Sequence, residues 1–225
     1  MKAPPPHYPE TMQRVARRTP SACAVGATKP CVVVVPKEVA QAFVELHHST
    51  QPYINPRGLL YTLGVIAGGQ LHAVATVNTP TARFRDRGCD VRSIVDLSRV
   101  ASDGKVLGAA SMLASKAIDL LPVSARDGGP ACLLVTYSLI QQAGTTYAAL
   151  VDKGLRPVEY VEGQRPTGQR RKSSMMALPT TPKIRWEAGS AAMPADWSLL
   201  AGKLPDERIR AMAARLAEFD RRNRR

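Results

Sequence analysis

The chain has 225 residues, of which 44% are hydrophobic; this supports a folded domain with a substantial core and excludes wholesale disorder. No apolar run approaches the roughly 18 residues of a membrane-spanning helix, and prolines interrupt residues 1–30 where a signal peptide needs an apolar core. We therefore expect a cytoplasmic protein without a membrane span. No CxxC pair or histidine pattern accompanies the cysteines, so the sequence predicts no metal site and no disulfide framework for Cys23, Cys31, Cys89 and Cys132.

The net charge of +13 is distributed unevenly along the chain. Residues 1–31 carry +4, residues 32–154 carry +2, and residues 155–225 carry +7. Basic ends around a nearly neutral centre are typical of a protein that binds a polyanion such as DNA, because cations that neutralise phosphates release counterions. The alternative is a solvated basic surface of a protein from an arginine-rich proteome, as the 22 arginines against 9 lysines would indicate.

The first 30 residues contain six prolines and no sustained apolar period, so we predict a mobile arm. Residues 31–35 are a β-branched run that predicts a strand. Pro36 then opens a helix, because Val39, Ala42, Phe43 and Leu46 fall on one helical stripe. This helix ends at two adjacent histidines, and the prolines and glycine that follow predict a polar loop.

A hairpin is predicted next. Residues 59–67 and 71–77 are strand-like and are joined by Gly68-Gly69. A polar, arginine-rich loop leads to a strand that starts at Val91. Asp103-Gly104 then forms a turn, and apolar residues at steps of three and four predict a helix over residues 106–121.

The segment that leads from the turn into the first residues of this helix, residues 105–110, predicts an anion site. It contains one cation and several small residues, and it leads directly into a helix. The first N–H groups of a helix lack intrahelical acceptors, and the helix dipole favours negative charge beside them. A pyrophosphate fits this description, whereas an ordinary strand-loop-helix connection is the alternative.

The second half of the chain continues the α/β pattern. We predict a strand over residues 131–137, a short helix over residues 145–153 that ends at Gly154, and a hairpin formed by residues 155–161 and 173–178 around a basic tip. From Leu204 the sequence predicts an amphipathic helix. Its apolar face would dock on the core or on a second copy in a homodimer, and it ends with Arg221, Arg222, Arg224 and Arg225.

This order of elements resembles the GNAT acyltransferase superfamily. The GNAT pyrophosphate loop reads Gln/Arg-x-x-Gly-x-Gly/Ala, and residues 105–110, KVLGAA, match it except that Lys105 replaces Gln or Arg. The resemblance implies a GNAT-like N-acyltransferase fold, with a mixed central sheet flanked by helices and a C-terminal helix. It also implies acetyl-CoA or a related acyl-CoA as the donor.

A narrower resemblance covers roughly residues 32–186 and rests on spaced blocks that recur together, including residues 47–48, 73–75, 80–83, 97–100, 136–138 and 182–186. It is to the phage and prophage group of GNAT-like proteins that includes the Mom DNA-modification protein. This resemblance implies an enzyme of phage or prophage origin that modifies DNA bases and so protects the DNA from restriction. The chain would then consist of an arm (1–30), a GNAT-like domain (31–186), and a linker with a basic amphipathic helix (187–225).

The same resemblance implies the cofactor contacts. The pyrophosphate would lie on the loop and the first turn of the following helix, with the pantetheine along the preceding strand. The residues implied are Val100, Ala101, Lys105, Gly108, Ala109, Ala110, Ser111 and Ser138.

For the chemistry, GNAT enzymes use a base to deprotonate the amine and commonly a tyrosine to protonate the leaving thiolate. The usual tyrosine position is Leu150 in this chain, so Tyr137 or Tyr147 would have to replace it. Either His47 or His48 is a candidate for the base, or for a ligand to substrate or metal, because histidine titrates near neutral pH. The histidine without this role would cap the helix or lie on the surface.

Arg99 ends an apolar strand beside the loop, where it pairs with a nearby aspartate or binds a phosphate of substrate or cofactor. Three functions remain open: a DNA-base acyltransferase, an acetyltransferase for a small molecule, an aminoacyl-tRNA or a protein amine, and a non-catalytic nucleic-acid binder. The intact phosphate loop argues against the third, since a pure binder does not need it.

Overall fold

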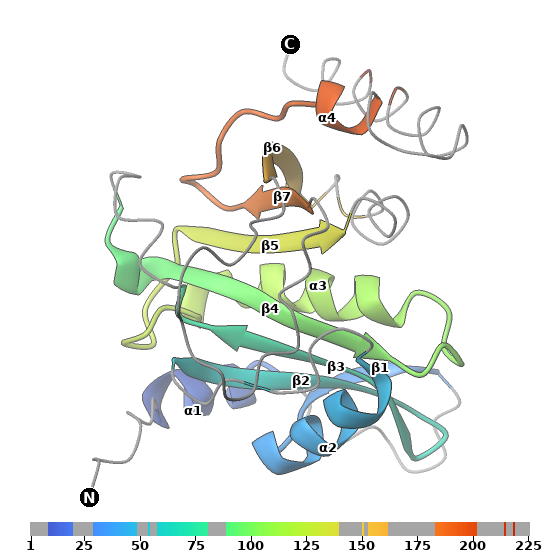
Figure 1. Cartoon of the computed structure of the whole chain (residues 1–225). Coiled ribbons are helices and arrows are strands. Elements are labelled where there is room, and N and C mark those ends of the chain that lie inside the picture. Colours follow the sequence, from blue (N-terminus) through green and yellow to red (C-terminus); the bar gives the residue numbers. More distant parts are fainter. Residues whose placement is uncertain are drawn as a thin grey trace, which may run out of the picture. The chain divides into compact units, whose positions relative to one another are not determined.

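The computed structural model describes residues 9–19, 29–48, 54, 58–80, 89–139, 150, 153–161, 183–201, 214 and 218. Their strands form a seven-stranded sheet in the order β1-β2-β3-β4-β5-β7-β6 (Figure 1). The strands are β1 (Cys31–Val34), β2 (Leu59–Ala67), β3 (Gln70–Asn78), β4 (Ile94–Ser102), β5 (Leu133–Leu139), β6 (Arg156–Val161) and β7 (Lys183–Ala188).

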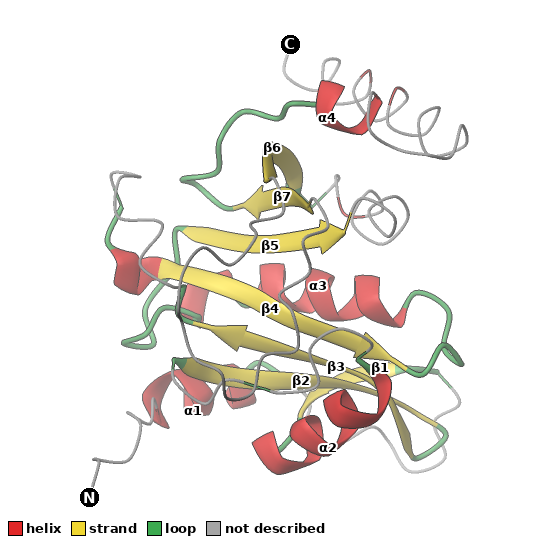
Figure 2. Ribbon diagram, viewed as in Figure 1, coloured by secondary structure: helices red, strands yellow, loops and turns green. Residues whose placement is uncertain are grey.

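Helices and single turns connect these strands (Figure 2). The helices are α1 (Pro9–Arg17), α2 (Lys37–His47), α3 (Ala109–Asp119) and α4 (Ser198–Ala201), and the 3₁₀ turns are η2 (Val91–Ser93) and η3 (Leu121–Val123). The expected α/β class is confirmed. None of the described helices is long and apolar enough to cross a membrane.

The chain divides into two compact units. The first contains residues 1–135 and 188–192, and the second contains residues 136–187 and 193–225. In the first unit, β1 to β4 pair antiparallel with their neighbours in chain order, as the predicted hairpin requires. Helices α2 and α3 lie on opposite faces of these strands (Figure 1).

The side of the sheet that α2 covers has an apolar core, called here the α2 side. Val33 and Val35, Val74 from β3 and Ala101 from β4 pack there against Phe43 and Val44 of α2. Because cross-strand partners share a face, and because residues two apart along a strand also share it, Thr76 and Asn78 continue the α2 side toward the end of β3. This extension is polar, and the candidate site develops from it.

In the second unit, β6 pairs antiparallel with β7. The buried Trp186 lies on β7 between Arg185 and Glu187, whose side chains form an ion pair of 3.0 Å from Nε to Oε1. The backbone N–H of Asp196 donates to the carbonyl of Pro157, which ties the segment before α4 to β6.

Two expectations are wrong. Residues 9–17 of the predicted arm form α1, in which Thr11 and Val15 are fully buried and the Thr11 hydroxyl donates to the carbonyl of Ala125 at 2.8 Å. Only one face of this short helix is buried, so the sequence shows no sustained apolar period there. Cys31 is disulfide-bonded, whereas Cys89 and Cys132 are free thiols.

Three predicted elements fall outside the described residues. These are the strand at 173–178, the helix at 145–153 apart from Leu150 and Lys153, and the C-terminal helix from Leu204 apart from Ala214 and Glu218. The second strand of the final hairpin is β7, at residues 183–188. The domain boundaries at residues 30 and 186 stay a prediction.

One glycine of the first unit is predicted to be essential for stability. Gly189 has φ of +118°, and a Cβ there would lie 2.4 Å from the carbonyl oxygen of Cys132. We expect Gly189→Ala to lower the free energy of unfolding by about 2–3 kcal/mol, because the backbone must shift as well as bear strain. Gly154→Ala is the matched control, since Gly154 has φ of +87° with open space around it, and should cost about 1–2 kcal/mol. Thermal unfolding checks this, and equal losses would contradict it.

Candidate active site

The loop between β4 and α3 bends at two glycines. Gly104 and Gly108 have φ of +79° and +75°, values that only glycine adopts without strain. A Cβ at either position would meet no atom within 4 Å, so the space beside the loop is open. Gly108 is the N-cap of α3, and the helix therefore starts at Ala109, three residues later than the sequence predicts. The glycines let a ligand approach the backbone.

The N-terminus of α3 presents backbone donors. The Ala109 N–H reaches only the Val106 carbonyl, at 3.3 Å, and within the described part of the chain the N–H groups of Leu107, Gly108 and Ala110 have no backbone acceptor. The first turn of α3 contains no acidic residue. These donors, the dipole of α3 and the exposed Lys105 together favour an anion at this place.

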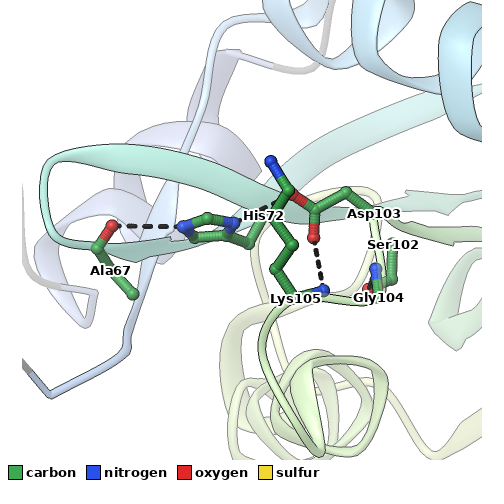
Figure 3. Close-up of polar contacts among 6 residues, drawn as sticks. All are labelled: Ala67, His72, Ser102, Asp103, Gly104 and Lys105. Carbon is green, nitrogen blue, oxygen red and sulfur yellow. Dashed lines mark hydrogen bonds and ion pairs between the residues drawn. The ribbon is translucent and has the colours of Figure 1, made fainter.

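Asp103 fixes the start of the loop (Figure 3). Its Oδ1 accepts from the Lys105 N–H at 2.9 Å, and its Oδ2 lies 2.9 Å from Nδ1 of His72. The pKa of Asp103 is lowered, mainly because its carboxylate accepts from the Lys105 N–H. Burial opposes this, and the hydrogen bond to His72 and the charges of His72 and Lys105 lower the pKa further. The loop conformation is thus held by an ionised carboxylate.

The predicted cofactor residues lie mainly on this loop. Lys105, Gly108, Ala109 and Ala110 follow one another from the loop into α3, and Ser111 is partly buried in its first turn. Val100 and Ala101 lie in β4, where the Ala101 side chain is buried in the core of the α2 side. Contact of these residues with a cofactor stays a prediction.

The two histidines at the end of α2 have different environments. His47 is exposed, and its ring packs against Phe43 with 4.4 Å between the ring centroids. His48 is the C-cap residue, is partly buried, and donates its backbone N–H to Val44. The structure thus distinguishes a surface histidine from one that faces the protein.

His48 lies near Arg99 on the α2 side. The pKa of His48 is lowered by burial and then by the positive charge of Arg99, against a smaller opposing contribution from its own backbone hydrogen bond. Burial also lowers the pKa of Arg99, while Asp96 opposes this. Nη1 of Arg99 donates to the carbonyl of Ser98 at 2.8 Å. His48 is therefore biased toward the neutral imidazole, which can accept a proton.

A β-bulge at Ser98 creates this arrangement. Thr76 pairs with Arg99 but Val77 pairs with Leu97, so Ser98 is the extra residue of β4. Arg99 therefore lies on the same face as Asn78 and Asp96, which pair with one another.

Asn78 belongs to this polar cluster, although its sequence position gave no signal for it. Its Nδ2 donates to Ser98 Oγ at 2.8 Å. Its buried Oδ1, like the buried Nε of Arg99, has no hydrogen-bond partner in the described part of the chain. Buried polar atoms are normally paired, so this cluster has capacity to bind another group.

The remaining predicted residues belong to the second unit. Tyr137 and Ser138 lie in β5, and the buried hydroxyl of Ser138 accepts from Nε1 of Trp186 at 2.9 Å, a packing role that the sequence did not indicate. Tyr147 lies outside the described residues. In the part of the chain that the structure describes, no three His, Cys, Asp or Glu side chains are grouped to hold a metal ion.

No protein-family model matches the chain, and no curated protein matches its sequence. Solved structures that resemble it include the IAA acetyltransferase from Bacillus cereus, with a TM-score of 0.44, 12% identity, and coverage of 72% of this chain and 99% of that chain. An acetyltransferase from Bacillus subtilis in complex with CoA has a TM-score of 0.44 and 10% identity, and the match covers 72% of this chain and 99% of that chain. A GNAT family acetyltransferase from Elizabethkingia anophelis with acetyl-CoA bound has a TM-score of 0.44 and 8% identity, and the match covers 71% of this chain and 97% of that chain. These low scores and identities do not by themselves assign the chain to a family.

Proposed function

We propose that the protein is an acyl-CoA-dependent N-acyltransferase of GNAT type, with acetyl-CoA or a related thioester as donor. The observation that carries this proposal is the β4–α3 loop, where open backbone at Gly104 and Gly108 leads to N–H groups at the start of α3 that have no backbone acceptor among the described residues. A pyrophosphate needs this combination of donors, dipole and close approach. The loop sequence also matches the GNAT pattern at every position but the first.

The residues present fit a bound acyl-CoA. The N–H groups of Leu107, Gly108 and Ala110 would hold its phosphate oxygens, with Lys105 adding a positive charge. When bound, the thioester supplies an activated acyl group. His48 is our choice for the base that accepts the proton of the acceptor amine, because it is partly buried and biased toward its neutral form. Burial and then the charge of Arg99 favour its neutral form, and Arg99 binds an anionic or carbonyl group of the acceptor.

For the acceptor, we propose an amine of a DNA base. The resemblance to Mom-like proteins supports this, as does the charge distribution, in which +11 of the +13 lies outside residues 32–154. Arg17 and Arg18 are exposed at the end of α1, and Nζ of Lys116 lies 2.9 Å from the Arg18 carbonyl, so a third cation lies near the end of this helix. Cations grouped in this way suit a phosphate backbone.

The test is mass spectrometry of nucleosides from the DNA of cells that express the protein, with cells expressing Gly108→Glu as the matched control. We expect an acylated nucleoside only with the wild-type chain. A base reacts only when it is flipped out to a bound donor, and Gly108→Glu should prevent the donor from binding. Unmodified DNA together with an acylated small molecule, aminoacyl-tRNA or protein would contradict the proposed DNA acceptor but support the proposed acyltransferase activity. The absence of any acyl transfer from acetyl-CoA would overturn both.

A further inference from the structure

His72 of β3 links the β2–β3 hairpin to the start of the phosphate loop (Figure 3). The residue is 9% exposed, and each ring nitrogen has a partner. Nδ1 lies 2.9 Å from Oδ2 of Asp103, and Nε2 lies 3.2 Å from the carbonyl oxygen of Ala67 in β2. No sequence pattern singles out this histidine.

The partners determine where the ring protons are. The Ala67 carbonyl has no hydrogen to donate, and the Asp103 carboxylate is ionised, so it also accepts only. Each ring nitrogen must therefore donate to satisfy both contacts, and an imidazole that donates twice is the imidazolium cation. In the neutral ring, one nitrogen would direct a lone pair at an oxygen.

Asp103 in turn determines the path of the loop. Its Oδ1 holds the Lys105 N–H, and its own N–H donates to the carbonyl of His72 at 3.0 Å. The next residue, Gly104, donates its N–H to Ser102 Oγ at 3.1 Å. His72 thus holds both the backbone and the side chain of the residue that shapes the loop.

We propose that His72 is a positioning residue for the phosphate loop, and that its doubly protonated ring holds Asp103 in the conformation that binds the anionic ligand. The inference rests on the proposed function in that the ligand is a CoA thioester. Among the described residues drawn in Figure 3, the charged side chains beside His72 are those of Asp103 and Lys105 of the loop, whereas Ala67 of β2 contributes only its carbonyl. Affinity for CoA should fall when the ring has only one proton, because a neutral ring cannot donate to both oxygens.

The Asp103→Asn variant separates this effect from the turn itself. Its carboxamide oxygen can still accept from the Lys105 N–H, while its amide can donate to a neutral ring at Nδ1 and leave Nε2 to donate to Ala67. The variant therefore suits neutral His72. Ser102→Ala is the matched control, because it removes the contact to Gly104 without touching the ring.

The experiment is titration calorimetry with CoA at about pH 6 and about pH 8.5. From about pH 6 to about pH 8.5, we expect the affinity of the wild-type protein for CoA to fall about fivefold more than that of Asp103→Asn. This difference corresponds to the loss of one hydrogen bond. Ser102→Ala should bind more weakly at both pH values and keep the wild-type pH dependence. Equal pH dependence in wild type and Asp103→Asn would overturn the inference and leave the proposed function standing.

A second measurement uses the unliganded protein, so it remains decisive if CoA does not bind. Nitrogen chemical shifts of the His72 ring should show both nitrogens protonated at about pH 6. Hydrogen exchange at the Lys105 amide, corrected for the intrinsic effect of pH, should become less protected at about pH 8.5 in wild type only. A neutral ring at about pH 6, or protection that does not change, would overturn the positioning role whatever the ligand.

Discussion

Gly108→Glu is expected to abolish the rise in melting temperature that acetyl-CoA gives the wild-type protein. A ligand that binds only the folded state stabilises it by about 2.7 kcal/mol at a hundredfold excess over its dissociation constant. The new side chain would start from a position with open space, beside the N–H groups at the start of α3 that lack a backbone acceptor in the described part of the chain, and would place a carboxylate where the pyrophosphate belongs. Repulsion and competition for the same donors should weaken binding at least a hundredfold, an effect of about 3 kcal/mol.

Two variants separate charge from backbone strain. Gly69→Glu introduces the same carboxylate at φ of +77°, also in open space, but in the turn of the β2–β3 hairpin. It should lower the melting temperature without preventing the shift by acetyl-CoA. Gly108→Ala adds a methyl group with the same backbone strain as Gly108→Glu and should retain most of the binding. If no CoA thioester at millimolar concentration raises the melting temperature of the wild-type protein, the assignment of the cofactor is wrong.

His48→Gln should lower kcat by roughly 10²–10⁴-fold and leave CoA affinity within about twofold of the wild type. Glutamine keeps a polar side chain at the end of α2 but cannot accept the proton of the amine. Acetyl-CoA consumption with duplex DNA as acceptor measures the rate, and calorimetry measures CoA binding. His47→Gln is the control, since the exposed ring of His47 packs on Phe43 and should contribute little to the rate. Equal losses in both variants would remove His48 from the mechanism.

The pH profile gives the same assignment a second test. The pKa of His48 is lowered, so its proton-accepting form persists to lower pH than for an ordinary histidine. The rate should therefore fall with decreasing pH only when the pH passes through that lowered pKa. Arg99→Gln removes the positive charge that is the second cause of the lowered pKa of His48. The fall in rate should therefore begin at a higher pH in this variant. A limb that does not move would mean that another group titrates.

Local patterns predicted much of the fold. Alternation and Gly68-Gly69 gave the β2–β3 hairpin, the apolar stripe gave α2, and small residues before a periodic segment gave the loop and α3. Helix α1 was missed, because two buried residues and long-range hydrogen bonds hold it rather than a continuous apolar face.

The site could be predicted only where its chemistry is local. Backbone donors at a helix start follow from sequence spacing, so the loop was found. The contacts of Asn78 with Ser98 and of His72 with Asp103 join residues 20 and 31 positions apart, and no periodicity encodes such pairs. Which of two adjacent histidines faces inward likewise depends on the angle at which α2 ends, and that angle is set by packing.

The bulge at Ser98 has a consequence for how the chain tolerates insertions and deletions. Residues three apart on a regular strand point to opposite faces, yet Asp96 and Arg99 share one because β4 contains a single supernumerary residue. Removing Ser98 would restore regular alternation and reverse the sidedness of whichever half of β4 shifts its pairing. Either Arg99 would leave His48 for the opposite face, or Asp96 would leave Arg99. One deletion would thus dismantle the polar cluster with every one of its other side chains still present in the chain.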